Sequence, residues 1–210
     1  IGLLVFLILF QQTLQSGLIT SFVGAIERQS APVLVYSIDG RVNLQGSVIA
    51  PDIEQRIAAV DGVAEAGRLG QLTATVRAGG TTDTVALIGY DTEGLGSPGE
   101  VTTGRLPRAD GEAVALASAA GDGFDVGDTV VVEPAGYEIE VVGLAERIGL
   151  QASTTLFTTY ATYEETVKAA NPDATAAPPA AITLRPEPGI SAETLVQRVN
   201  DAVPDADAYT

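Results

Sequence analysis

The stretch GRLPRADGEAVAL, from Gly104 to Leu116, decides the architecture together with VGDTV at residues 126–130 and YEIEVVGL at residues 137–144. Short apolar segments alternate here with Gly and Asp, a pattern that is typical of short strands joined by tight turns. The strand candidates of this region are residues 113–117, 129–133 and 137–144. The sequence therefore predicts a compact β-rich unit over residues 99–150.

Strands and helices are expected on both sides of this unit. Pro51 opens a helix before it, and Ser191 caps a helix after it. The two helices share an echo, since Gln-Arg-Ile at residues 55–57 matches Gln-Arg-Val at residues 197–199. Two related strand–helix–strand halves would produce the echo, and so would chance similarity of two amphipathic helices. Further strands are expected at residues 33–37, 69–78, 84–90, 154–158, 181–185 and 206–209, and a further helix at residues 162–170.

The N-terminal residues 1–10 read IGLLVFLILF, an apolar run that is too short to span a bilayer. An amphipathic helical pattern continues to about residue 29, and Pro32 then stops it. We expect the outer end of a transmembrane helix, whose first half lies upstream of Ile1, followed by a stalk. The core of a signal peptide and a buried soluble helix are the alternatives. The expected contact face of the stalk is Leu14, Leu18, Phe22 and Ile26.

Composition excludes several classes of function. The formal net charge is −16, from 27 acidic and 11 basic residues, so the surface repels phosphate backbones and nucleic-acid binding is not expected. The chain has no Cys, His, Met or Trp. An ordinary zinc site and the Ser-His-Asp and Cys-His nucleophile arrangements are therefore excluded. We assign no catalytic, cofactor-binding or metal-binding residue.

Two motifs resemble ligand sites only in form. Residues 94–99 match G-x-G-x-x-G, but a dinucleotide site needs a helix directly after the motif, and Pro98 opposes one. Asp122, Asp125 and Asp128 recur at every third position, which does not match the spacing of an EF-hand loop. The glycines among them favour turns over a calcium site.

The order of motifs resembles the extracytoplasmic domain of MacB/FtsX-like ABC transporter permeases. Gly-Arg-Leu-Pro, Gly-Glu, Gly-Asp and Val-Val-Gly follow one another behind the apolar N-terminal segment. The residues that carry this resemblance, and that we expect to specify the fold, are Gly104, Arg105, Pro107, Gly111, Glu112, Gly127, Asp128 and Gly143. The resemblance implies an α+β fold with two βαβ-type halves, a porter-like subdomain, and an inserted small β-rich lobe after a transmembrane and stalk helix. The implied boundaries are 1–29 for the helix, 30–98 and 151–210 for the two halves, and 99–150 for the lobe.

The resemblance also implies a function. The domain would face the outside of the cell (inner or plasma) membrane and would be non-catalytic, because a separate ABC ATPase subunit hydrolyses ATP. It would couple that hydrolysis to export, lipoprotein release or cell-envelope work. Expected partners are the ATPase, a second permease in a homo- or heterodimer, and an envelope protein or a lipid or lipoprotein substrate. The alternatives are a membrane-anchored periplasmic adaptor or binding protein of an efflux system, and a secreted hydrolase that uses carboxylates.

Overall fold

A computed structural model describes residues 32–40, 44, 46–92, 94–146, 154–174 and 176–210. The expected transmembrane segment and the stalk face of Leu14, Leu18, Phe22 and Ile26 lie outside these residues. In the part of the chain that is described, no helix is long and apolar enough to cross a membrane.

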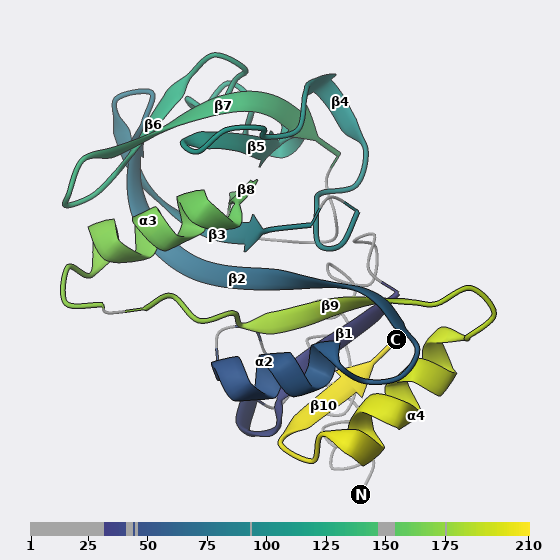
Figure 1. The fold of residues 1–210 in the computed structure, drawn as a ribbon. Coiled ribbons are helices and arrows are strands. Elements are labelled where there is room, and N and C mark those ends of the chain that lie inside the picture. Colours follow the sequence, from purple (N-terminus) through teal and green to yellow (C-terminus); the bar gives the residue numbers. More distant parts are fainter. Residues whose placement is uncertain (1–31, 41–43, 45, 93, 147–153, 175) are drawn as a thin grey trace, which may run out of the picture.

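The described chain alternates short helices with strands of very different lengths (Figure 1). The strands are β1 (Val33–Ser37), β2 (Val63–Ala78), β3 (Thr81–Tyr90), β4 (Val101–Gly104), β5 (Glu112–Leu116), β6 (Thr129–Val132), β7 (Tyr137–Ala145), β8 (Thr155–Thr159), β9 (Ala181–Pro186) and β10 (Ala206–Tyr209). The helices are α2 (Pro51–Ala58), α3 (Tyr160–Ala170) and α4 (Ala192–Ala202), with 3-10 turns η1 (Ile38–Gly40) and η2 (Ala117–Ala119). All of the expected strands and helices that fall in the described residues are present. Strand β2 begins six residues before its expected start at residue 69, and the other expected ends agree within three residues. Strand β4 is an addition that the sequence did not predict.

Four strands form a small antiparallel sheet in the order β10-β1-β9-β2, at the bottom of Figure 1. Helices α2 and α4 each connect two strands of this sheet, and their apolar faces are buried against it. Ile57 of α2 and Leu195 and Val199 of α4 are fully buried together with Val33 and Val35 of β1. This order of strands and helices is that of a split βαβ arrangement.

Strand β2 and five further strands close into a barrel, and β4 pairs with β7 outside this ring. Each of β2, β3, β8, β5, β7 and β6 pairs with the next, and β6 pairs back to β2. The barrel interior is filled by alternating small and branched side chains, mainly Val and Ala, with Phe124 buried among them. Because β2, β3 and β8 join it, the barrel is larger than the small lobe of residues 99–150 that the sequence predicts. Local periodicity identifies the strands but not the long-range β3–β8 and β2–β6 pairings that close the ring.

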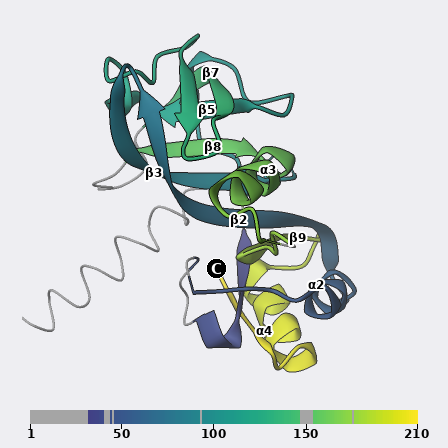
Figure 2. The same cartoon turned by 90° about the vertical axis from the view of Figure 1, so that its left-hand side faces the viewer.

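Strand β2 belongs to both units. Its first part pairs with β9 in the small sheet, and its second part pairs with β3 and β6 in the barrel. The side view in Figure 2 shows β2 running from the sheet at the bottom into the barrel above it. The expected segments 1–29, 30–98, 99–150 and 151–210 stay predictions. Backbone hydrogen bonds nevertheless join the segment before residue 98 to the segment after residue 150, because β3 pairs directly with β8.

Helix α3 packs on the β2–β3 hairpin at a pair of glycines. Gly70 and Gly89 are directly opposite each other in the hairpin, and the side chain of Tyr163 lies against both. A Cβ atom at Gly70 would lie 2.6 Å from Cδ1 of the Tyr163 ring, and a Cβ atom at Gly89 would overlap the Tyr163 Cβ. The two glycines therefore make the notch into which a buried tyrosine fits.

Candidate functional site at the sheet–barrel junction

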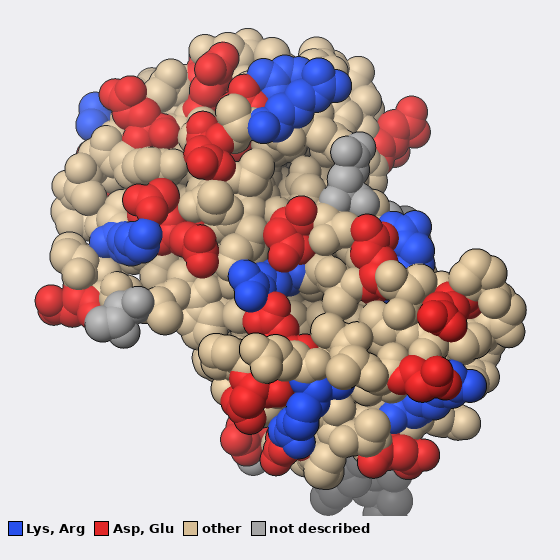
Figure 3. Space-filling view, viewed as in Figure 1, with Lys and Arg blue, Asp and Glu red and all other residues tan. Residues whose placement is uncertain are grey.

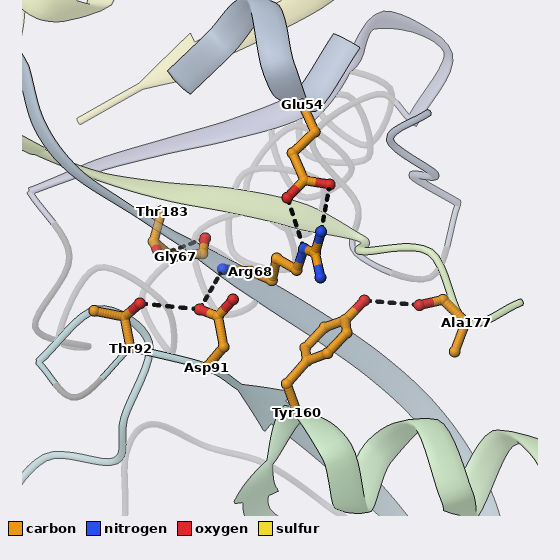
Figure 4. Close-up of polar contacts among 8 residues, drawn as sticks. All are labelled: Glu54, Gly67, Arg68, Asp91, Thr92, Tyr160, Ala177 and Thr183. Atoms are coloured by element: carbon orange, nitrogen blue, oxygen red, sulfur yellow. Dashed lines mark hydrogen bonds and ion pairs between the residues drawn. The ribbon is translucent and has the colours of Figure 1, made fainter. Parts of the chain in front are cut away.

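Arg68 stands where β2 passes from the sheet into the barrel, and its side chain contacts both units (Figure 4). The Arg68 Nε donates to Glu54 Oε1 of α2 at 2.6 Å, and Nη2 donates to Glu54 Oε2 at 3.2 Å. The same guanidinium lies 5.8 Å from the ring centroid of Tyr160, the first residue of α3, in a cation–π contact. The hydrogen bond to Glu54 is the main reason that the pKa of Arg68 is raised.

Tyr160 is anchored in turn. Its hydroxyl donates to the carbonyl oxygen of Ala177 at 2.7 Å, just before β9. The side chain is only 6% exposed, and burial raises the pKa of the phenol. A chain of contacts therefore runs from α2 through Arg68 and Tyr160 to the segment that leads back into the small sheet.

The backbone of Arg68 is held by a side chain from the end of β3. The β2–β3 ladder begins at Leu69 and Tyr90, and the Arg68 N–H beyond it donates to Asp91 Oδ1 at 2.7 Å. The Thr92 hydroxyl donates to the same oxygen at 3.0 Å. Asp91 thus extends the ladder by one residue and fixes both the main chain and, through it, the side chain of Arg68.

A cavity of about 300 Å³ opens beside this junction. It is lined by the end of β3, the loop after β4 and the start of α3, namely Tyr90, Asp91, Leu106, Pro107, Thr159, Tyr160 and Ala161. Its size is at the lower end of the range of small-molecule sites. The cavity shares Asp91 and Tyr160 with the contacts of Arg68.

The loop that lines this cavity is held by the Arg105–Glu112 pair. Arg105 donates from Nη1 and Nη2 to the two Glu112 oxygens at 2.6 Å each, a bidentate geometry. Glu112 also accepts the backbone N–H groups of Arg108 and Ala109, at 2.8 and 3.2 Å. Hydrogen bonding to Arg105 is the main reason that the pKa of Glu112 is lowered to about 2. The carboxylate therefore ties the loop to the start of β5.

Seven of the eight residues of the family motif, all except Pro107, lie in β7 or in segments that are hydrogen-bonded to it. Gly104 has φ of +77°, and a side chain there would meet the Val142 carbonyl, while a Cβ at Gly143 would meet the Arg105 carbonyl. The Gly111 carbonyl accepts the N–H of Glu140, and the Asp128 carbonyl accepts the N–H of Val141. Gly127 donates its N–H to the Val141 carbonyl, and Pro107 lines the cavity. The motif thus surrounds a single strand, and its role in specifying the fold stays a prediction.

The two motifs that resembled ligand sites serve other purposes. Asp125 Oδ2 accepts the Gly121 N–H and Asp128 Oδ2 accepts the Asp125 N–H, which is turn chemistry. Among the described residues, no group of three or more His, Cys, Asp or Glu could hold a metal ion. Residues 94–99 lead into strand β4 and not into a helix, so the phosphate-binding context of G-x-G-x-x-G is missing.

The junction residues Glu54, Arg68, Asp91 and Tyr160 were not predicted from the sequence. Each is a common residue type, and they come from α2, β2, the end of β3 and α3. Only the pairing of distant strands brings them together. No local spacing of the sequence marks them.

Comparison with known proteins gives a consistent result. The family model described as "MacB-like periplasmic core domain" matches residues 1–202. The fold is similar to the periplasmic region of MacB from Actinobacillus actinomycetemcomitans, with 14% identity, a TM-score of 0.61, and coverage of 88% of this chain and 91% of that one. It is also similar to the extracellular domain of the noncanonic ABC-type transporter YknZ from Gram-positive bacteria, with 11% identity, a TM-score of 0.56, and coverage of 85% and 99%. No protein with a curated description matches the sequence.

Proposed function

The chain belongs to the family of MacB-like periplasmic core domains, and on this premise we propose that it transmits movement in an ABC transporter permease. A separate ATPase subunit would hydrolyse ATP on the cytoplasmic side of the membrane. The domain itself would be non-catalytic and would do work on the outer side, as export, lipoprotein release or another task in the cell envelope.

The continuity of β2 is the observation that carries this proposal. A strand of 16 residues is shared by the small sheet and the barrel, so a displacement of the sheet reaches the barrel through unbroken backbone hydrogen bonds. The Glu54–Arg68–Tyr160 contacts fix the angle between the units on the side of α2 and α3. Such an arrangement favours movement of the whole domain as one body.

The entry and exit of the described chain support the same proposal. Strand β1 begins and β10 ends at the same end of the small sheet, where Leu34 is paired with Tyr209. A membrane helix before β1 and another after β10 would therefore approach the sheet side by side. Motion of either helix would act first on the small sheet, and the barrel would follow.

The proposed partners follow from this role. The ATPase subunit and a second permease, in a homo- or heterodimer, would assemble at and within the membrane. An envelope protein, or a lipid or lipoprotein substrate, would be met by the barrel. Figure 3 shows Asp and Glu side chains spread over both units of one face, interspersed with Arg and Lys. We accordingly propose no nucleic-acid partner.

Distance measurements on the full-length permease with its ATPase test this proposal. These 210 residues contain no cysteine, so exposed Thr103 on β4 and Gln197 on α4 can be replaced by Cys for spin labelling with no competing thiol inside the domain. We expect the distance between Thr103→Cys labels on two protomers to differ between the nucleotide-free and ATP-bound states. The distance from Thr103→Cys to Gln197→Cys within one protomer should stay constant.

Arg68→Ala should broaden the distance distribution within the protomer, because it removes the contacts on both Glu54 and Tyr160. Arg185→Ala is the matched control, since the Arg185–Glu65 ion pair joins β9 to β2 inside the small sheet and does not involve α3. A barrel-to-barrel distance that does not respond to ATP would contradict the proposal. An ATP response of both the barrel-to-barrel distance and the distance within one protomer would contradict the one-body mechanism only.

A further inference from the structure

The side chain of Asn200 binds the backbone of β10 from outside the sheet. Its Oδ1 accepts the N–H of Ala208 at 2.7 Å, and its Nδ2 donates to the carbonyl oxygen of the same residue at 3.4 Å. Asn200 lies near the end of α4, eight residues earlier in the chain. One primary amide thus meets both hydrogen-bonding groups of one residue, as a neighbouring strand would.

These groups belong to the outer edge of the sheet. Strand β10 is the terminal strand of the order β10-β1-β9-β2, and it pairs with β1 on its other side. Backbone groups of successive residues in an antiparallel strand point to opposite sides, so Ala206 faces the same way as Ala208. The N–H of Ala206 is also bonded from within, to the carbonyl oxygen of Val203 at 3.0 Å. Both outward-facing N–H groups of β10 are therefore satisfied by α4 and the residue that follows it.

The opposite edge of the small sheet is closed in the same manner. At the point where the β2–β3 ladder stops, the Arg68 N–H is accepted by the carboxylate of Asp91. Side chains thus take the place of a strand at both edges. Unpaired edge strands attract other strands, and proteins cover or block them to avoid association.

We propose that Asn200 closes the β10 edge against strand addition, and that the partner it keeps out is the same edge of a second copy of this chain. Antiparallel pairing of β10 with β10 is self-complementary, so two copies related by a two-fold axis present matching donors and acceptors to each other. Four-residue β10 is short, yet the methyl groups of Ala206 and Ala208 are small and buried in the core of the small sheet, so they do not obstruct an approaching strand. The proposal concerns the sheet alone and is independent of the transport role.

Asn200→Ala tests the proposal. Alanine has the higher helix propensity, so the substitution leaves α4 intact while it frees the Ala208 N–H and C=O. In the full chain kept in detergent, we expect hydrogen exchange of the Ala208 amide to become roughly fivefold faster at low protein concentration. We expect the apparent dissociation constant for self-association, measured by light scattering across a concentration series, to fall by roughly tenfold.

Two further variants separate edge pairing from other causes. Asn171→Ala removes the asparagine that follows α3, where its side chain accepts the N–H of Asp173, and should leave self-association unchanged. Ala208→Pro added to Asn200→Ala removes the outward N–H and should return self-association to the wild-type level. Self-association of Asn200→Ala equal to that of the wild type would overturn the proposal. Enhanced association that Ala208→Pro fails to reverse would also overturn it, because the contact would then lie elsewhere.

Discussion

Gly89→Ala is the substitution for which the structure gives the clearest prediction. Gly89 is in β3 with ordinary strand φ, so alanine is compatible with its backbone. The obstacle is α3, because the new Cβ would overlap the Tyr163 Cβ and lie 2.9 Å from its Cγ. A Cβ cannot swing away as the end of a flexible side chain can, and so the helix or the hairpin has to move.

The expected size follows from two opposing effects. Overpacking of this kind costs about 1–3 kcal/mol, whereas replacing glycine within a strand stabilises by about 0.5–1 kcal/mol. We expect Gly89→Ala to lower the free energy of unfolding by about 1–2 kcal/mol. Tyr163 is 5% exposed, and Tyr163→Gly should lower the same quantity by about 4 kcal/mol, through the cavity it leaves and the low helix propensity of glycine in α3.

The combination of the two changes reverses the sign of the first. Once Tyr163→Gly has removed the Tyr163 Cβ as well as the ring, the notch is empty, and Gly89→Ala should raise the free energy of unfolding by about 0.5 kcal/mol. The coupling energy of the pair would then be about 2 kcal/mol, which is measurable by urea unfolding followed by far-UV circular dichroism. If the two changes add, with Gly89→Ala equally harmful in both backgrounds, the notch is not the reason for the glycine. Gly80→Ala, whose Cβ would meet nothing within 4 Å, is unsuitable as a control because its φ is +84°.

Three further outcomes are expected. Glu112→Gln should be less stable than the wild type above pH 5, because the pKa of Glu112 is about 2 in the folded chain and lies below the ordinary value of 4.5. The difference in free energy of unfolding should vanish as the pH falls toward 2. A difference that persists at pH 2 would count against the role of the charge. Ser191→Ala should cost about 1 kcal/mol in urea unfolding, since the Ser191 hydroxyl accepts the Thr194 N–H at the start of α4; no loss of stability would mean that water replaces the cap. Burial raises the pKa of Tyr36 from 10.0 to about 12. The stability that comes from its neutral phenol should therefore be present up to about pH 10 and be lost as the pH rises through 12. Ultraviolet titration of the wild type and of Tyr36→Phe would show whether the phenol that ionises late is Tyr36.

Local chemistry was enough to predict most elements. Pro51 is the first residue of α2, and the Ser191 hydroxyl caps α4. Gly79 and Gly80 join β2 to β3 with φ of +55° and +84°, the positive values for which a Gly-Gly pair is favoured in a hairpin turn. These features depend on a few neighbouring residues, and so they can be read from the chain without knowledge of its tertiary structure.

Closure of the barrel and assembly of the junction could not be predicted in this way. Strand β3 lies parallel to β8, which begins about 65 residues later, and no short-range pattern encodes that choice. Glu54 and Arg68 contact each other only because α2 packs beside β2, the strand that follows it. Tyr160 begins α3, which follows β8, the last barrel strand in the chain. Glu112 was expected to help specify the fold, but its partner Arg105 became known only from the structure.

Strand β2 has a consequence for how the chain folds. Neither the small sheet nor the barrel is complete without β2. The small sheet would lose the strand that pairs with β9, and the barrel would open between β3 and β6. Melting of one unit therefore removes half of the pairing that holds β2 in the other. The two units should gain and lose structure in a single cooperative transition, and neither should be obtainable as a stable fragment.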